Sequence, residues 1–176
     1  MNGPLELKSC LQMRSIDGPC SPDTAQLVSL VLNNPRYRLE TQQRSPCRKD
    51  ATDLLCELPA GATPEQKYVW GLWANEQLIG CLEVLRGWPH AHHLYIGQLL
   101  IAEAHQRQGY GIRSLQMLAE RSRGWAKIHR WRLAVVESQL AARAFWKRAG
   151  FVETGQRTQL PQYRNPLVLM EKPIGR

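Results

Sequence analysis

The feature that most constrains the fold is a stretch in the second half of the chain that changes from apolar to glycine-containing to amphipathic. Residues 94–101 are mostly apolar, which is typical of a central strand buried on both faces. Over residues 111–124 the apolar side chains Ile112, Leu115 and Leu118 recur at helical spacing. A strand, a polar connection and a helix in this order favour a mixed α/β fold.

The connection between this strand and helix has the sequence QRQGYG over residues 106–111 and is suited to bind an anion. The first N–H groups of a helix have no partner within the helix and lie at the positive end of its dipole. Gly109 and Gly111 lack a Cβ atom, so a phosphate can approach the backbone, and Arg107 and Arg113 can add charged hydrogen bonds. The segment lacks the Gly-Lys-Ser/Thr ending of a nucleotide P-loop, which argues against ATP hydrolysis.

The rest of the chain supplies the other elements of such a fold. We expect strands over residues 5–16, 67–74, 77–85, 131–136, 151–157 and 166–172. Helices are expected from an N-cap at Ser21 to residue 32, over residues 50–58, and over residues 140–149 with Ala141, Ala144, Phe145 and Ala149 facing inward. Residues 36–48 are expected to be irregular. The prediction is one domain over residues 1–176, a three-layer α/β sandwich with a mixed sheet of about six or seven strands and about four helices.

Composition excludes several other classes of protein. No run of about 18 apolar residues is present, and the N-terminus lacks a basic segment followed by an apolar one, so we expect a cytoplasmic protein without a membrane span. The five cysteines are scattered without a C-x-x-C pair, and His90, His92 and His93 have no cysteine or carboxylate at ligand spacing, so no metal is expected. The net charge of +8 leaves a nucleic-acid-binding protein as a rival, although no DNA-reading motif supports it.

Two segments together carry a resemblance to a known family. The first is Gln106-x-x-Gly109-x-Gly111, and the second is FWKRAGF over residues 145–151. In this order, separated by a helix and a strand, they resemble the GNAT superfamily of N-acetyltransferases. The resemblance implies a GNAT-like sandwich that binds acetyl-CoA as acyl donor, and it does not specify the acceptor.

The resemblance also implies where the cofactor binds. Its pyrophosphate is expected on the amides of residues 106–111, and its pantetheine arm is expected to pair with the strand at Leu99 and Ile101. A strand amide near Leu99 or Leu100 would polarise the thioester carbonyl. The full expected set is Leu99, Leu100, Ile101, Gln106, Arg107, Gln108, Gly109, Tyr110, Gly111, Ile112, Arg113, Gln139, Phe145 and Trp146.

The sequence departs from the family pattern at the positions that carry acid–base chemistry. Many relatives have a glutamate on the strand before the loop, where this chain has Gly97 and Gln98, and a tyrosine where it has Trp146. Gln139 replaces a frequent asparagine. A protonated amine needs a base or a water relay before it can attack, and the candidates are Glu83, His93 and Tyr95.

These inferences lead to a functional hypothesis with open alternatives. The chain is expected to transfer an acetyl group to a primary amine of a small molecule or an amino-acid-like acceptor, by direct attack. A peptide or protein N-acetyltransferase, and a GNAT-fold CoA sensor or scaffold without efficient catalysis, remain alternatives. Five basic side chains in residues 36–49 would disfavour a polycationic acceptor and suit a carboxylate or phosphate. A homodimer is implied by the resemblance only.

Overall fold

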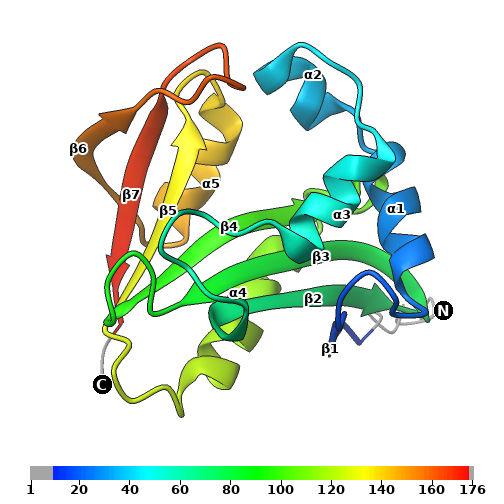
Figure 1. The fold of residues 1–176 in the computed structure, drawn as a ribbon, viewed down its shortest axis with the longest axis horizontal. Coiled ribbons are helices and arrows are strands. Elements are labelled where there is room, and N and C mark those ends of the chain that lie inside the picture. Colours follow the sequence, from blue (N-terminus) through cyan, green and yellow to red (C-terminus); the bar gives the residue numbers. More distant parts are fainter. Residues whose placement is uncertain (1–9, 175–176) are drawn as a thin grey trace, which may run out of the picture.

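A computed structural model describes residues 10–174 as one seven-stranded mixed sheet with helices on both faces (Figure 1). The strand order is β1-β2-β3-β4-β5-β7-β6, and every neighbouring pair is antiparallel except β4 and β5. The strands are β1 (Gln12–Ser15), β2 (Lys67–Ala74), β3 (Gln77–Arg86), β4 (His93–Ile101), β5 (Arg130–Val136), β6 (Val152–Thr158) and β7 (Leu167–Pro173). The helices are α1 (Thr24–Leu32), α2 (Arg36–Gln42), α3 (Arg48–Cys56), α4 (Tyr110–Ser122) and α5 (Leu140–Arg148). The predicted α/β sandwich is confirmed.

The two faces of the sheet carry two separate cores. On one face, α4 and α5 contribute Leu115, Leu118 and Trp146 to a core with alternate residues of β2 to β5 and β7. On the other face, α1 and α3 contribute Leu27 and Leu55 to a smaller core over β2 and β3. Among residues 10–174, no helix is long and apolar enough to cross a membrane.

Several local expectations differ from the structure. The segment expected to be irregular contains α2, because Tyr37 and Thr41 provide a partly buried face and Arg36 pairs with Glu40 one turn later, at 2.8 Å. Its inward residues are polar or aromatic, so no aliphatic periodicity marks it. Helix α1 begins at Thr24 rather than after Ser21, whose hydroxyl instead accepts a hydrogen bond from the Asp23 N–H in the preceding turn.

Two further expectations need correction. Ala141 and Ala144 are exposed, and α5 instead packs through Ala142, Phe145 and Trp146, so its inward face is rotated from the predicted one. The strand expected over residues 5–16 appears only as β1, and residues 5–9 lie outside the described part of the chain.

A substitution at Gly80 can test how closely β3 and β4 pair. A Cβ atom at this position would lie 2.5 Å from the backbone oxygen of Leu100, and a backbone atom cannot move aside cheaply. Gly80→Ala should therefore lower the free energy of unfolding by about 1–3 kcal/mol, seen as a midpoint lower by roughly 2–10 °C in thermal unfolding. Gly124→Ala is the matched control, because its Cβ would meet no atom within 4 Å. Equal stability of both variants would contradict the close approach of the two strands at Gly80.

Candidate functional site

The centre of the candidate site is the place where β4 separates from β5. The two strands pair only from His93 to Ile96 on β4 and from Arg130 to Leu133 on β5. Beyond this point β5 continues against β7, and β4 continues against β3. Figure 1 shows the two strands diverging. The edge of β4 over residues 97–101 that points away from β3 therefore faces no strand in the described chain. Apart from the Ile101 oxygen, which accepts a hydrogen bond from Gln106, the backbone groups on this edge can pair with an extended ligand.

A bulge in β4 lies at the point of separation. Val84 pairs with Ile96, but Glu83 pairs with Gln98, so Gly97 is an extra residue on β4. The bulge changes the alternation of side chains: Ile96 and Leu99 both face the core under α4 and α5. A bulge bends a strand and strengthens its twist, which is consistent with β4 leaving β5 here.

The loop before α4 presents free backbone donors, as expected from its sequence. In the described chain, the N–H groups of residues 107–112 donate no hydrogen bond, and the first to do so is that of Arg113, to the Gly109 oxygen at 3.0 Å. Gly109 has a φ of 86°, and a Cβ there would meet nothing within 4 Å, so the backbone is open to a ligand. Gln106 Nε2 donates to the Ile101 oxygen at 2.9 Å, which holds the loop against the end of β4.

The two glycines of the loop serve different purposes. A Cβ at Gly111 would come within 3.0 Å of the Phe145 ring, so this glycine allows α5 to pack against the start of α4. From the sequence, we expected Gly111 to let a phosphate come close to the backbone. In the structure, the group close to this position is the Phe145 ring.

The other expected cofactor residues divide into two groups. Those around the loop and the free edge of β4 lie together: Leu99, Leu100, Ile101, Arg107, Gln108, Tyr110, Ile112 and Arg113. The remaining side chains are engaged elsewhere. Gln139 donates to Glu40 Oε2 at 3.0 Å, and Trp146 is buried between Phe145 and Phe151.

Glu83 lies directly beside the bulge. A Cβ at Gly97 would come within 2.6 Å of Glu83 Oε2, so the Glu83 carboxylate fills the space that a side chain at position 97 would take. Its other oxygen, Oε1, accepts a hydrogen bond from Lys67 Nζ at 2.5 Å. Burial raises the pKa of Glu83, and the Lys67 ammonium opposes part of that rise.

The other two candidate bases differ from Glu83 in environment. Tyr95 packs edge-on against Trp88 with ring centroids 4.9 Å apart, and burial raises its pKa to about 12. His93 is buried at the start of β4, where the sheet is still closed, and burial lowers its pKa. Its Nδ1 atom is buried without a hydrogen-bond partner in the described chain. Its ring lies near those of His90 and His92, yet no group of metal ligands occurs among residues 10–174.

Helix α2 extends from this site to the C-terminal half of the molecule. The Tyr37 and Tyr163 hydroxyls lie 3.4 Å apart, and the Arg164 N–H donates to the Thr41 oxygen at 3.2 Å. Burial raises the pKa of Tyr37. Sequence analysis missed both tyrosines, because Tyr37 lies in a segment without apolar periodicity and Tyr163 lies in a loop.

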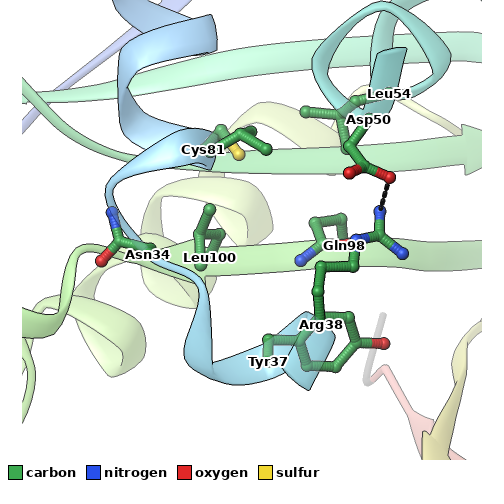
Figure 2. A pocket seen from close by; sticks show the side chains of 9 residues that line it. Asn34, Tyr37, Arg38, Asp50, Leu54, Cys81, Gln98 and Leu100 are labelled. Atoms are coloured by element: carbon green, nitrogen blue, oxygen red, sulfur yellow. Dashed lines mark ion pairs between the residues drawn. The ribbon is translucent and has the colours of Figure 1, made fainter. Parts of the chain in front are cut away.

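A small cavity opens between α1, α2, α3 and the sheet (Figure 2). Tyr37, Arg38 and Asp50 line it from the helices, and Gln98 and Leu100 line it from β4. Asp50 is buried and accepts hydrogen bonds from both Nη atoms of Arg44, at 2.9 and 2.5 Å. Arg44 is the main reason that the pKa of Asp50 lies well below its usual range.

The basic segment of residues 36–49 is largely paired. Arg36 pairs with Glu40, Lys49 with Asp53, and Arg38 and Arg44 with Asp50. The expected preference for an anionic acceptor stays a prediction, and in the structure four of the five basic side chains have acidic partners nearby in sequence. Two positive charges are left within the described chain: one on Arg48, which is exposed and makes no ion pair there, and one at the Arg38–Arg44–Asp50 cluster.

Comparisons with known proteins agree with this geometry. A model of the GNAT acetyltransferase family matches residues 32–151. An acetyltransferase from Thermus thermophilus has 22% sequence identity and a TM-score of 0.74, over 95% of this chain and 99% of that one. RimL, a ribosomal L7/L12 α-N-protein acetyltransferase solved with coenzyme A, has 19% identity and a TM-score of 0.73, over 97% of both chains.

A third similar structure is that of an enzyme named for a different kind of acceptor. The aminoglycoside acetyltransferase AAC(6')-Ib, in complex with coenzyme A, has 20% identity and a TM-score of 0.69, over 93% of this chain and 95% of that one. No curated protein sequence matches the chain significantly. Because the family model spans more than half of the chain and the diverging strands and helix-capping loop are in place, this protein belongs to the GNAT family of acetyltransferases.

Proposed function

We propose that this protein transfers an acetyl group from acetyl-CoA to the primary amine of a small, amino-acid-like acceptor. The observation that carries the proposal is the Glu83 carboxylate beside Gly97, at the point where β4 leaves β5. This carboxylate supports the proposal because it lies close to the part of β4 that would hold an acyl donor, where a base is needed. The nucleic-acid alternative has only the net charge of +8 in its favour.

The residues present fit acetyl-CoA. The free N–H groups of residues 107–112, with Arg107 and Arg113 exposed nearby, would bind its phosphates. The free edge of β4 would hold its amide-containing arm, and an N–H near Leu99 or Leu100 would donate to the carbonyl oxygen as negative charge develops there. When bound, acetyl-CoA supplies the activated acyl group.

Glu83 is the residue that we assign as the base. An amine with a lysine-like pKa near 10.4 is mostly protonated at neutral pH, and removing the proton costs about 4–5 kcal/mol. A carboxylate whose pKa is raised toward the working pH is suited to accept that proton, directly or through one water. Tyr95, with its raised pKa, would act as a hydrogen-bond donor. His93 lies at the start of β4, where β4 is still paired with β5.

The position of helix α2 over the site favours a small acceptor. Helix α2 contacts residues 163 and 164 and the residue that precedes α5, so it narrows the approach to Glu83 and Tyr95. Fold similarity alone does not choose the acceptor, since the neighbours include enzymes for both proteins and small molecules. A peptide or protein amine is therefore the alternative acceptor.

Binding of acetyl-CoA can be measured by thermal unfolding. A ligand at 100 times its dissociation constant adds about 2.7 kcal/mol of stability, which corresponds to roughly 5–10 °C for a chain of this size. We expect this shift with acetyl-CoA and CoA, and none with ATP. Gly109→Ala should abolish the shift, because its Cβ enters the path of the phosphates.

Gly61→Ala is the matched control for this measurement. Gly61 also has a positive φ, 79° against 86° at Gly109, and a Cβ at either position meets no atom within 4 Å. Both variants therefore carry similar backbone strain, and only Gly109→Ala should lose the ligand shift. The absence of any shift in the unchanged protein would refute the cofactor site.

The role of Glu83 can be tested by the pH dependence of turnover. Only the ionised carboxylate accepts a proton, so kcat/KM should rise with pH through a midpoint above the ordinary glutamate value of 4.5. Glu83→Gln should lower kcat/KM by about a hundredfold or more and remove this rising limb, while the shift with CoA persists. Unchanged turnover would place the base elsewhere.

Gly97→Ala tests the same site without removing the carboxylate. The new Cβ would overlap Glu83 Oε2, so the carboxylate must move and kcat should fall, whereas CoA binding should remain. Gly124→Ala serves as control, since it adds the same methyl group in open space. If Gly97→Ala retained full kcat, the position of Glu83 beside the bulge would not matter for transfer.

A further inference from the structure

We propose that Arg38 binds a carboxylate on the acceptor, so that the preferred substrates are amines that also carry a carboxylate. This inference rests on the proposed transfer to an amine and names the class of acceptor. It starts from the charges around Asp50, where two guanidinium groups meet a single carboxylate.

Asp50 is already fully engaged without Arg38. Both of its oxygens accept hydrogen bonds from Arg44, and Oδ2 also accepts one from the Cys47 N–H at 2.8 Å. Arg38 Nη2 lies 3.3 Å from Oδ1, the atom that Arg44 Nη2 contacts at 2.5 Å. The cluster of two arginines and one aspartate therefore keeps an excess of one positive charge.

That excess charge lies on a side chain with unused donors. Within residues 10–174, the guanidinium of Arg38 makes no hydrogen bond that satisfies distance and angle, and its only close charged partner is Asp50. Its side chain is 21% exposed, so water covers only part of it. A guanidinium fork in such a setting binds a carboxylate through two parallel hydrogen bonds, and more strongly than it would at a fully exposed site.

Among the described residues that line the cavity, Asp50 is the only acid. Besides Asp50, the cavity is lined by the neutral polar side chains of Asn34, Tyr37 and Gln98 and by the apolar or thiol side chains of Val31, Leu54, Cys81 and Leu100. In Figure 2 a dashed line joins the Arg38 guanidinium to Asp50, and both side chains belong to the lining of the cavity. The centroid of the Tyr37 ring lies 5.7 Å from the Arg38 guanidinium carbon.

The position of Arg38 relative to the base suits a small bifunctional molecule. Gln98 shares the cavity with Arg38 and is also the strand partner of Glu83. Paired residues on antiparallel strands have Cα atoms about 4.5–5.5 Å apart. An amine at Glu83 and a carboxylate at Arg38 can therefore belong to one small molecule.

The test compares matched acceptors at saturating acetyl-CoA. The panel contains α-amino acids, ω-amino carboxylates of increasing chain length, and the carboxamide of each, with release of the CoA thiol as the readout. The unchanged protein should show a kcat/KM ratio of carboxylate to carboxamide of about tenfold to a hundredfold for its best acceptor. In Arg38→Gln this ratio should fall toward one.

Arg44→Gln is the matched control. Arg44 also pairs with Asp50, but it does not line the cavity, so this variant should lose stability while the carboxylate-to-carboxamide ratio persists. If both variants lost the preference for carboxylates over carboxamides equally, the Asp50 cluster would affect the preference only by stabilising the fold, which would overturn the inference. A ratio near one in the unchanged protein, or a ratio retained in Arg38→Gln, would overturn the inference.

A second measurement separates this inference from the proposed transfer. Thermal unfolding of the CoA-saturated protein with each acceptor reports binding without turnover. If no amine is acetylated, the transfer proposal fails, and the role of Arg38 is then decided by binding alone. Stabilisation by carboxylates that is lost in Arg38→Gln would support the anion site, and equal stabilisation by carboxylates and carboxamides would overturn it.

Discussion

The separation of β4 from β5 is the constraint on which the rest of the site depends. A sheet satisfies its backbone groups by pairing strands, so a strand that leaves its neighbour exposes a row of donors and acceptors. Here the exposed row follows Ile96, at a bulge formed by Gly97, and leads into the loop whose free N–H groups begin α4. Strand edge and helix start therefore form one continuous backbone surface for an extended, phosphate-bearing ligand.

The same bulge lies beside a largely buried carboxylate. The resemblance implies a glutamate at Gly97 or Gln98 in many relatives, and the space beside Gly97 is here filled by Glu83 from the neighbouring strand. Lys67 hydrogen-bonds that carboxylate, so a group that is costly to bury has a partner. The Glu83 carboxylate therefore lies beside Gly97, where β4 leaves β5.

Ion pairs determine how much of the positive charge near α2 is left unpaired. Most of the basic residues near α2 are matched by acidic residues one helical turn away or across a short loop, so they act on the fold more than on a distant ligand. The exceptions are exposed Arg48, which makes no ion pair in the described chain, and the partly buried place where Arg38 and Arg44 share Asp50. Partial burial makes that single excess charge matter more than several exposed ones would.

The sequence by itself determined the order of strands and helices and the loop before α4, because periodicity, glycines and caps are local signals. Helix α2 was not predicted from the sequence, because its inward face consists of Tyr37 and Thr41 and contains no aliphatic side chains at helical spacing. The sequence also named Glu83 among three candidate bases without separating them. Only the tertiary structure placed Glu83 against Gly97 and paired the arginines with Asp50, because strand register and contacts between distant segments are fixed by packing, which no local pattern encodes.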